Sequence, residues 1–77
     1  MMTKTRFLNV YRDELNKRYP WAQDEAKLAR FMNSVSETIN GAGPGTWNHE
    51  GEAVTAAWRA IGGRGKPTKK ALRELAD

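Results

Sequence analysis

The clearest place for chemistry in this sequence is a basic stretch that surrounds a glycine-rich loop, residues 62–67. Its basic side chains are Arg59, Arg64, Lys66, Lys69, Lys70 and Arg73. Lysine and arginine bind phosphate oxygens through their charge and their N–H donors. A helix start after a glycine-rich loop adds unpaired backbone N–H groups. We therefore expect these side chains to contact phosphates of a nucleic acid, DNA more readily than RNA. The alternative is a solvated charged segment without a ligand.

Lys69 and Lys70 strengthen this expectation because they occupy an unfavourable position for cations. Both fall in the first turn of the last predicted helix, where the helix dipole already presents positive potential. Lysines at such a position indicate that an anion is accommodated there. The sequence therefore predicts phosphate contacts at the start of this helix as well as in the loop.

Charge is distributed unevenly along the chain, whose formal net charge is +4. Residues 1–18 carry five basic and two acidic side chains, residues 19–58 carry two basic and five acidic ones, and residues 59–77 carry six basic and two acidic ones. If the fold brings the two ends together, they would form one positive face, with Lys4, Arg6 and Arg12 extending the binding surface. Ordinary solubilising charge is the alternative explanation.

The sequence fits poorly to two better-known patterns, one for phosphate binding and one for DNA binding. A P-loop needs Gly-x-x-x-x-Gly-Lys-Ser/Thr after a strand, whereas here Pro67 follows Gly65-Lys66 and the preceding segment is helical. A helix-turn-helix uses a turn of about 3–4 residues, and the loop 62–67 is longer. Binding through phosphates alone requires neither pattern.

Catalysis has weak support in the sequence. His49 is the single histidine, and its acidic neighbours Glu50 and Glu52 fit a helix start better than a catalytic or metal site. The chain has no cysteine, which removes thiol catalysis and cysteine-ligated metals. We expect no enzymatic activity, no cofactor and no bound metal.

Hydrophobic periodicity predicts an all-α fold, with helices at about 5–18, 21–40, 48–61 and 68–75. In the second segment Leu28, Phe31, Met32, Val35 and Ile39 recur at helical spacing, and no segment alternates as a strand would. The length of 77 residues fits a single domain, 1–77, around one core rich in aromatic residues. Trp58, which shares a stripe with Val54 and Ile61, is expected in that core.

The ends of these helices carry recognisable signals. Pro20 should end the first helix, because the residue before a proline is driven to an extended conformation. Gly41 and Gly62 should end the second and third. Asn48 or Thr46 is expected to cap the third helix, and Thr68 the fourth.

The amino-acid composition also indicates where in the cell the protein is expected to be. No apolar run exceeds three residues, whereas a membrane span needs about 20, and nothing resembles a signal peptide. Together with the absence of cysteine, this favours a cytoplasmic protein that does not enter a membrane.

Trp47 is expected to pack in the core, and a different function follows if it is exposed instead. This residue lies between a glycine-rich connector and the third predicted helix, and exposed tryptophan is common at protein interfaces. In its shortness, helicity, basic charge and tryptophan content, the chain resembles small accessory proteins of phages and mobile elements. The alternative is therefore a small interaction or inhibitor module that binds a host or regulatory protein near Trp47. The oligomeric state is left open.

Overall fold

The computed structural model of the chain describes residues 3–41 and 51–76, and these form a helical fold. The elements are α1 (Lys4–Arg18), the 3₁₀ helix η1 (Pro20–Gln23), α2 (Glu25–Ile39), α3 (Gly51–Ala60) and α4 (Lys69–Arg73). In these described ranges the one extended pairing is an isolated parallel bridge between Thr3 and Ala76. The all-α prediction is confirmed.

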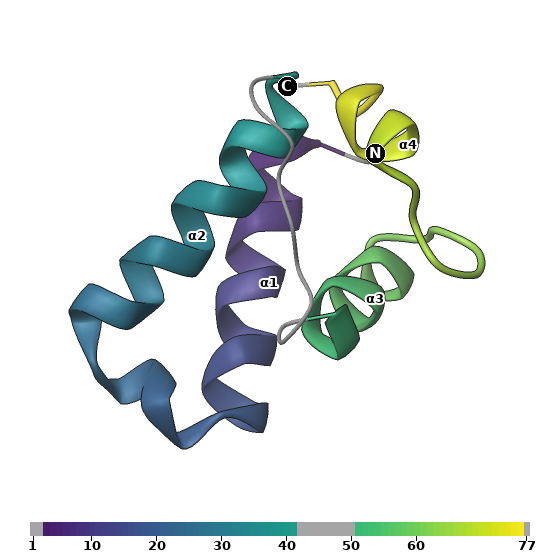
Figure 1. Ribbon diagram of the computed structural model, residues 1–77. Coiled ribbons are helices and arrows are strands. Elements are labelled where there is room, and N and C mark those ends of the chain that lie inside the picture. Colours follow the sequence, from purple (N-terminus) through teal and green to yellow (C-terminus); the bar gives the residue numbers. More distant parts are fainter. Residues whose placement is uncertain (1–2, 42–50, 77) are drawn as a thin grey trace.

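α1 lies at the centre of the arrangement, between α2 and α3 (Figure 1). Its residues Phe7, Tyr11 and Leu15 are spaced by four, so they share one face, and all three are fully buried. The rings of Phe7 and Tyr11 stack, with centroids 6.2 Å apart. This stripe is the middle of the hydrophobic core.

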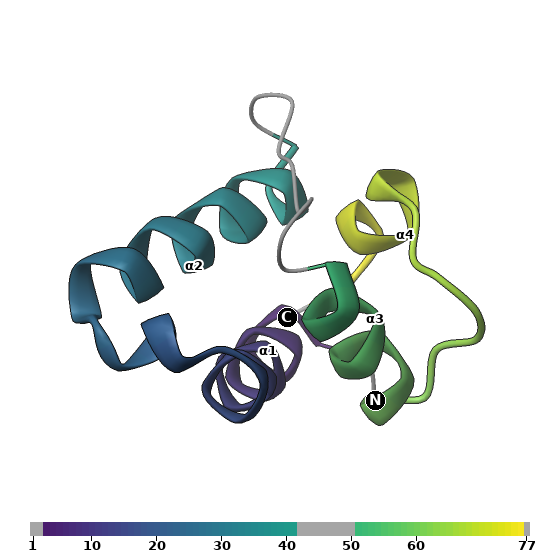
Figure 2. The same cartoon turned by 60° about the horizontal axis from the view of Figure 1, so that its bottom comes forward.

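Small residues allow α3 to pack along α1. Ala53 and Ala57 are fully buried, and Val54 beside them is almost so. Because alanine carries only a methyl group, the two helix backbones approach closely and leave the larger α1 side chains to fill the interface. Figure 2, which looks nearly along α1, shows α2 and α3 on different sides of it.

The first predicted boundary is confirmed. Tyr19 ends α1 with φ −127° and ψ 119°, the extended conformation that Pro20 imposes on the residue before it. Pro20 then begins η1, where its missing N–H costs no hydrogen bond.

The second helix starts later than predicted. Instead of running from residue 21, the chain forms η1 and then breaks at Asp24, which is extended. The Asp24 carboxylate accepts hydrogen bonds from the backbone N–H groups of Ala26 and Lys27, at 3.0 and 3.4 Å. Asp24 is thus the N-cap of α2, and its preference for that position outweighs continuation of the helix.

α2 ends at Ile39, and Gly41 follows with φ +79°, as the predicted stop requires. The buried residues of α2 are Val35, Thr38 and Ile39, all in its C-terminal half. The apolar side chains nearer its start are only partly buried. The core therefore sits toward the end of the molecule where α2 meets α4.

α4 closes that end of the core. Thr68 is its N-cap, as predicted, and accepts a hydrogen bond from the Ala71 N–H at 3.0 Å. Leu72 and Leu75 are buried beneath it. Within the described residues no helix is long and apolar enough to cross a membrane.

The two ends of the described chain meet beside α4. The backbone N–H of Lys4 donates to the carbonyl oxygen of Ala76 at 3.0 Å, alongside the bridge from Thr3. The basic segments at the two ends of the sequence are therefore neighbours in space.

Candidate nucleic-acid interface

The glycine-rich loop 62–67 starts with a regular helix ending. The Gly62 N–H donates to the Arg59 carbonyl at 3.0 Å, and the Gly63 N–H donates to the Trp58 carbonyl at 2.9 Å. This pair of bonds is the Schellman motif, and it needs a left-handed residue, which Gly62 supplies with φ +99°. The predicted stop at Gly62 is thus confirmed, and the loop leaves α3 in a fixed direction.

Side-chain contacts hold the rest of the loop against the protein. The indole Nε1 of Trp58 donates to the Arg64 carbonyl oxygen at 3.1 Å. A Cβ at Gly63 would collide with the same indole ring, so the backbone lies directly on it. Pro67 is buried. These contacts give the loop a defined path, and its basic side chains project from fixed positions.

The prediction that Trp58 lies in the core is only partly right. The ring is half-buried and packs against the core cluster from outside. Its indole N–H needs a hydrogen-bond acceptor, and the loop carbonyl provides one at the surface. Trp58 therefore joins the core to the loop, while Val54, Ala57 and Ile61 of the same stripe are buried.

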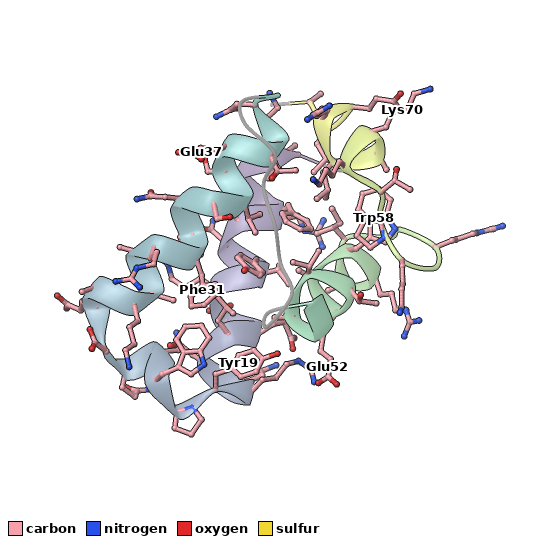
Figure 3. All side chains as sticks on the ribbon, viewed as in Figure 1. Tyr19, Phe31, Glu37, Glu52, Trp58 and Lys70 are labelled. Atoms are coloured by element: carbon pink, nitrogen blue, oxygen red, sulfur yellow. The ribbon has the colours of Figure 1, made fainter. Side chains whose placement is uncertain are left out.

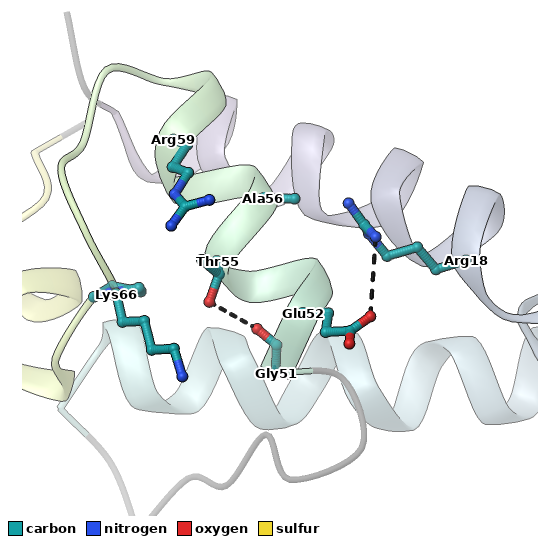
Figure 4. Close-up of a pocket in the computed structure, with 8 residues that line it drawn as sticks. Arg18, Gly51, Glu52, Thr55, Ala56, Arg59 and Lys66 are labelled. Carbon is teal, nitrogen blue, oxygen red and sulfur yellow. Dashed lines mark hydrogen bonds and ion pairs between the residues drawn. The ribbon is translucent and has the colours of Figure 1, made fainter.

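Three basic residues from three separate elements line one hollow of about 460 Å³, which we call the basic hollow. Arg18 comes from the end of α1, Arg59 from the end of α3 and Lys66 from the loop. The remaining lining residues are Gly51, Glu52, Thr55, Ala56 and Pro67. In the view of Figure 4 the Thr55 hydroxyl lies between the Arg59 guanidinium and the Lys66 amine.

One acidic residue, Glu52, lines the basic hollow and lies on the Arg18 side of it (Figure 4). Its Oε2 is 4.0 Å from Nη1 of Arg18, and its side chain is 82% exposed. Arg18 also pairs with Glu14, at 3.3 Å. The carboxylates thus compensate mainly Arg18, while Arg59 and Lys66 face the hollow from the other side. Three cations against one lining acid leave it positive.

The other predicted binding residues lie away from the basic hollow. Arg64 lines a neighbouring depression beside Trp58 and Glu74. Lys69 and Lys70 are at the start of α4, with Lys70 exposed. Figure 3 shows Lys70 at the opposite end of the molecule from Glu52. The predicted residues are therefore spread over more than one part of the surface rather than gathered in a single pocket.

Arg73, at the end of α4, contacts another helix through its side chain. Its Nε donates to the carbonyl oxygen of Thr38 at 3.4 Å, a contact between α4 and the last turn of α2. A cation near the last carbonyl groups of a helix is favourable for the helix dipole. Arg73 thus contributes to holding α4 in place.

α4 contains only five residues, and the Thr68 side chain already accepts one N–H of its first turn. The dipole of so short a helix is small, and few N–H groups remain for an anion. The basic side chains of this turn, rather than its backbone, are what it offers to a phosphate.

Arg18 lines the basic hollow but is absent from the binding residues predicted from the sequence. It was counted in the basic N-terminal segment, but no local motif distinguishes it from its neighbour Lys17. Its place in the basic hollow follows from the packing of α3 against α1, which joins residues 41 positions apart in sequence.

Two residues considered from the sequence lie outside the described ranges: Trp47, the possible partner contact, and His49. So do Thr46 and Asn48, the expected caps of α3. Among residues 3–41 and 51–76, no group of three or more histidine, aspartate or glutamate side chains could hold a metal ion. Comparison of the chain with models of protein families, with curated proteins and with solved structures finds no match.

Proposed function

We propose that this chain is a non-enzymatic nucleic-acid-binding module that contacts phosphates. The main observation in support of this proposal is that Arg18, Arg59 and Lys66 come from three elements and line one hollow. Since like charges repel, cations gathered around a concave surface favour an anion between them. Arginine and lysine donate charge-assisted hydrogen bonds to phosphate oxygens.

A polyanion fits the surface better than a small free anion does. Arg64 and Lys70 continue the positive surface beyond the basic hollow, on a molecule of 30 × 25 × 21 Å. Duplex DNA carries one charge per roughly 1.7 Å of its axis, so its phosphates could reach cations along such a surface. The loop 62–67 supports this proposal because its fixed path holds Arg64 and Lys66 in place before the ligand arrives.

The test measures the anisotropy of a short labelled DNA duplex with increasing protein over a series of salt concentrations. We expect affinity to fall linearly on a log–log plot, with a slope of about −0.9 per phosphate contacted. In Arg59→Gln/Lys66→Gln the slope should become shallower by about 1.8, because two contacts are lost.

A matched control is Arg6→Gln/Lys17→Gln, which removes two exposed cations that lie on α1 outside the basic hollow. This variant should lose less affinity than Arg59→Gln/Lys66→Gln does, because neither Arg6 nor Lys17 lines the basic hollow. Two results would overturn the proposal: no binding at low salt, or equal loss of affinity in both double variants, which would show that only total charge matters.

A further inference from the structure

A second hollow, of about 360 Å³, lies where η1 joins α1 to α2, and three aromatic rings line it. Tyr19 and Trp21 stack with centroids 5.2 Å apart, and Trp21 and Phe31 follow at 4.4 Å with their planes 30° apart. All three residues are only partly buried. We call this the aromatic hollow. Its rings form a short ladder that remains accessible from outside.

The other residues of the aromatic hollow are two cations, Lys27 and Arg30, both exposed. Lys27 lies four residues before Phe31, and Arg30 lies one residue before it. Because Lys27 and Arg30 are three residues apart, α2 presents both beside the ladder. Of the described residues that line this hollow, none is acidic. The nearby Asp24 carboxylate is occupied as the N-cap of α2. The hollow therefore combines an aromatic surface with two cations and no acidic residue among the described residues of its lining.

The aromatic and basic hollows share no lining residue, but their linings adjoin in the sequence at the end of α1. Arg18, the last residue of that helix, lines the basic hollow, and the next residue, Tyr19, lines the aromatic one. Figure 3 shows Tyr19 on the same end of the molecule as Glu52, which belongs to the basic hollow. A strand that followed the end of α1 around from Arg18 to Tyr19 would reach both hollows.

We propose that the aromatic hollow binds unpaired bases of single-stranded DNA, a proposal that rests on the proposed function. A base adds to the ring ladder by stacking, while Lys27 and Arg30 bind the flanking phosphates. Aromatic rings beside cations are the combination that single-strand-binding surfaces use, since every base has a face that stacks. In a duplex the base faces are covered by their neighbours, so a duplex engages only the cations. An uncharged apolar peptide would leave both cations without a counter-charge.

The first experiment needs no variant. It compares the affinity for labelled oligothymidylate of about twelve nucleotides, a strand length typical of small single-strand-binding domains, with that for an abasic strand of equal length and charge. If bases stack on the ladder, oligothymidylate binds about tenfold more tightly. Equal affinities would overturn this proposal and leave the phosphate-binding function standing. Absence of binding to both strands and to the duplex would overturn both.

The second experiment assigns the stacking to this hollow. Trp21→Leu should lose about the same tenfold for oligothymidylate and keep its affinity for the abasic strand. Trp58→Leu is the matched control, because Trp58 lies outside the aromatic hollow and should leave the ratio of the two affinities unchanged. Circular dichroism checks that each variant is helical.

If Trp21→Leu does not fold, Lys27→Gln/Arg30→Gln replaces it, since both side chains are exposed. This variant should lose more affinity for oligothymidylate than Arg6→Gln/Lys17→Gln does. Equal losses in these two double variants would place the stacking site elsewhere and overturn the assignment.

Discussion

The indole Nε1 of Trp58 donates a hydrogen bond to the carbonyl oxygen of Arg64 at 3.1 Å, which ties the basic loop to α3. The same ring lies against the backbone of Gly63 and packs on the core. The Trp58 side chain thus fixes the position of Arg64, and of Lys66 two residues later, relative to the core. The stability of the fold and the geometry of the proposed phosphate contacts are linked through it.

Trp58→Phe should lower both stability and affinity. The variant keeps an aromatic ring but loses the N–H donor, a change expected to cost about 0.5–1.5 kcal/mol in the free energy of unfolding. Affinity for DNA should fall because the loop is less fixed. Urea denaturation and anisotropy measure the two effects. Arg64→Ala is the contrasting variant: it keeps the backbone carbonyl, so DNA affinity should fall while stability is unchanged. Unaltered stability in Trp58→Phe would contradict the link.

Gly63→Ala should destabilise the protein more than Gly62→Ala. At Gly62 an added Cβ meets no atom within 4 Å, so the cost is that of a left-handed backbone, about 1 kcal/mol. At Gly63 the Cβ would collide with the Trp58 ring, and either the ring or the loop must move, at a cost of about 1–3 kcal/mol. Urea denaturation ranks the two variants. If Gly62→Ala were the more destabilising variant, the Trp58 ring would have moved aside without a loss of stability.

Lys69→Glu/Lys70→Glu should weaken DNA binding and preserve the helical circular-dichroism signal. Acidic residues suit the first turn of a helix, so the reversal does not oppose folding of α4. If both lysines contact phosphates, the salt dependence should become shallower by about two contacts. Unchanged affinity in this variant would remove the start of α4 from the binding surface.

Glu52→Gln should strengthen DNA binding, because it removes the one acidic residue that lines the basic hollow. A single exposed charge changes affinity by about two- to fivefold at low salt, and the gain should disappear as salt screens it. The matched control is Glu37→Gln on α2, an exposed acid outside that hollow. Anisotropy titrations at low and high salt measure both. Equal gains in the two variants would indicate an effect of net charge alone.

Local signals predicted the helices well because the groups that end a helix are close in sequence. Tyr19 becomes extended through its neighbour Pro20. Gly62 and Gly63 close α3 through bonds to residues three and five positions before them, and Thr68 caps the turn that follows it. The late start of α2 was the exception. Its predicted start, residue 21, lies before Asp24, the residue that caps the helix.

The candidate site could be predicted only in part. The basic side chains around the loop 62–67 form a run in the sequence, but the packing of the helices places them in different hollows and contacts. Arg59 and Lys66 share a hollow, Arg64 lines another, and Arg73 turns to the end of α2. The ladder of Tyr19, Trp21 and Phe31 is not evident in the sequence either, because its rings come from the end of α1, from η1 and from α2 and meet only through packing.

The sequence by itself determined the all-α fold, the helix ends and an excess of positive charge at both ends of the chain, since these depend on residues within a few positions of one another. Only the tertiary structure decided which cations face one another. Arg18 lines the same hollow as Arg59 and Lys66 because the alanines of α3 let this helix lie close along α1. That packing fixes the direction in which each side chain leaves the helix interface.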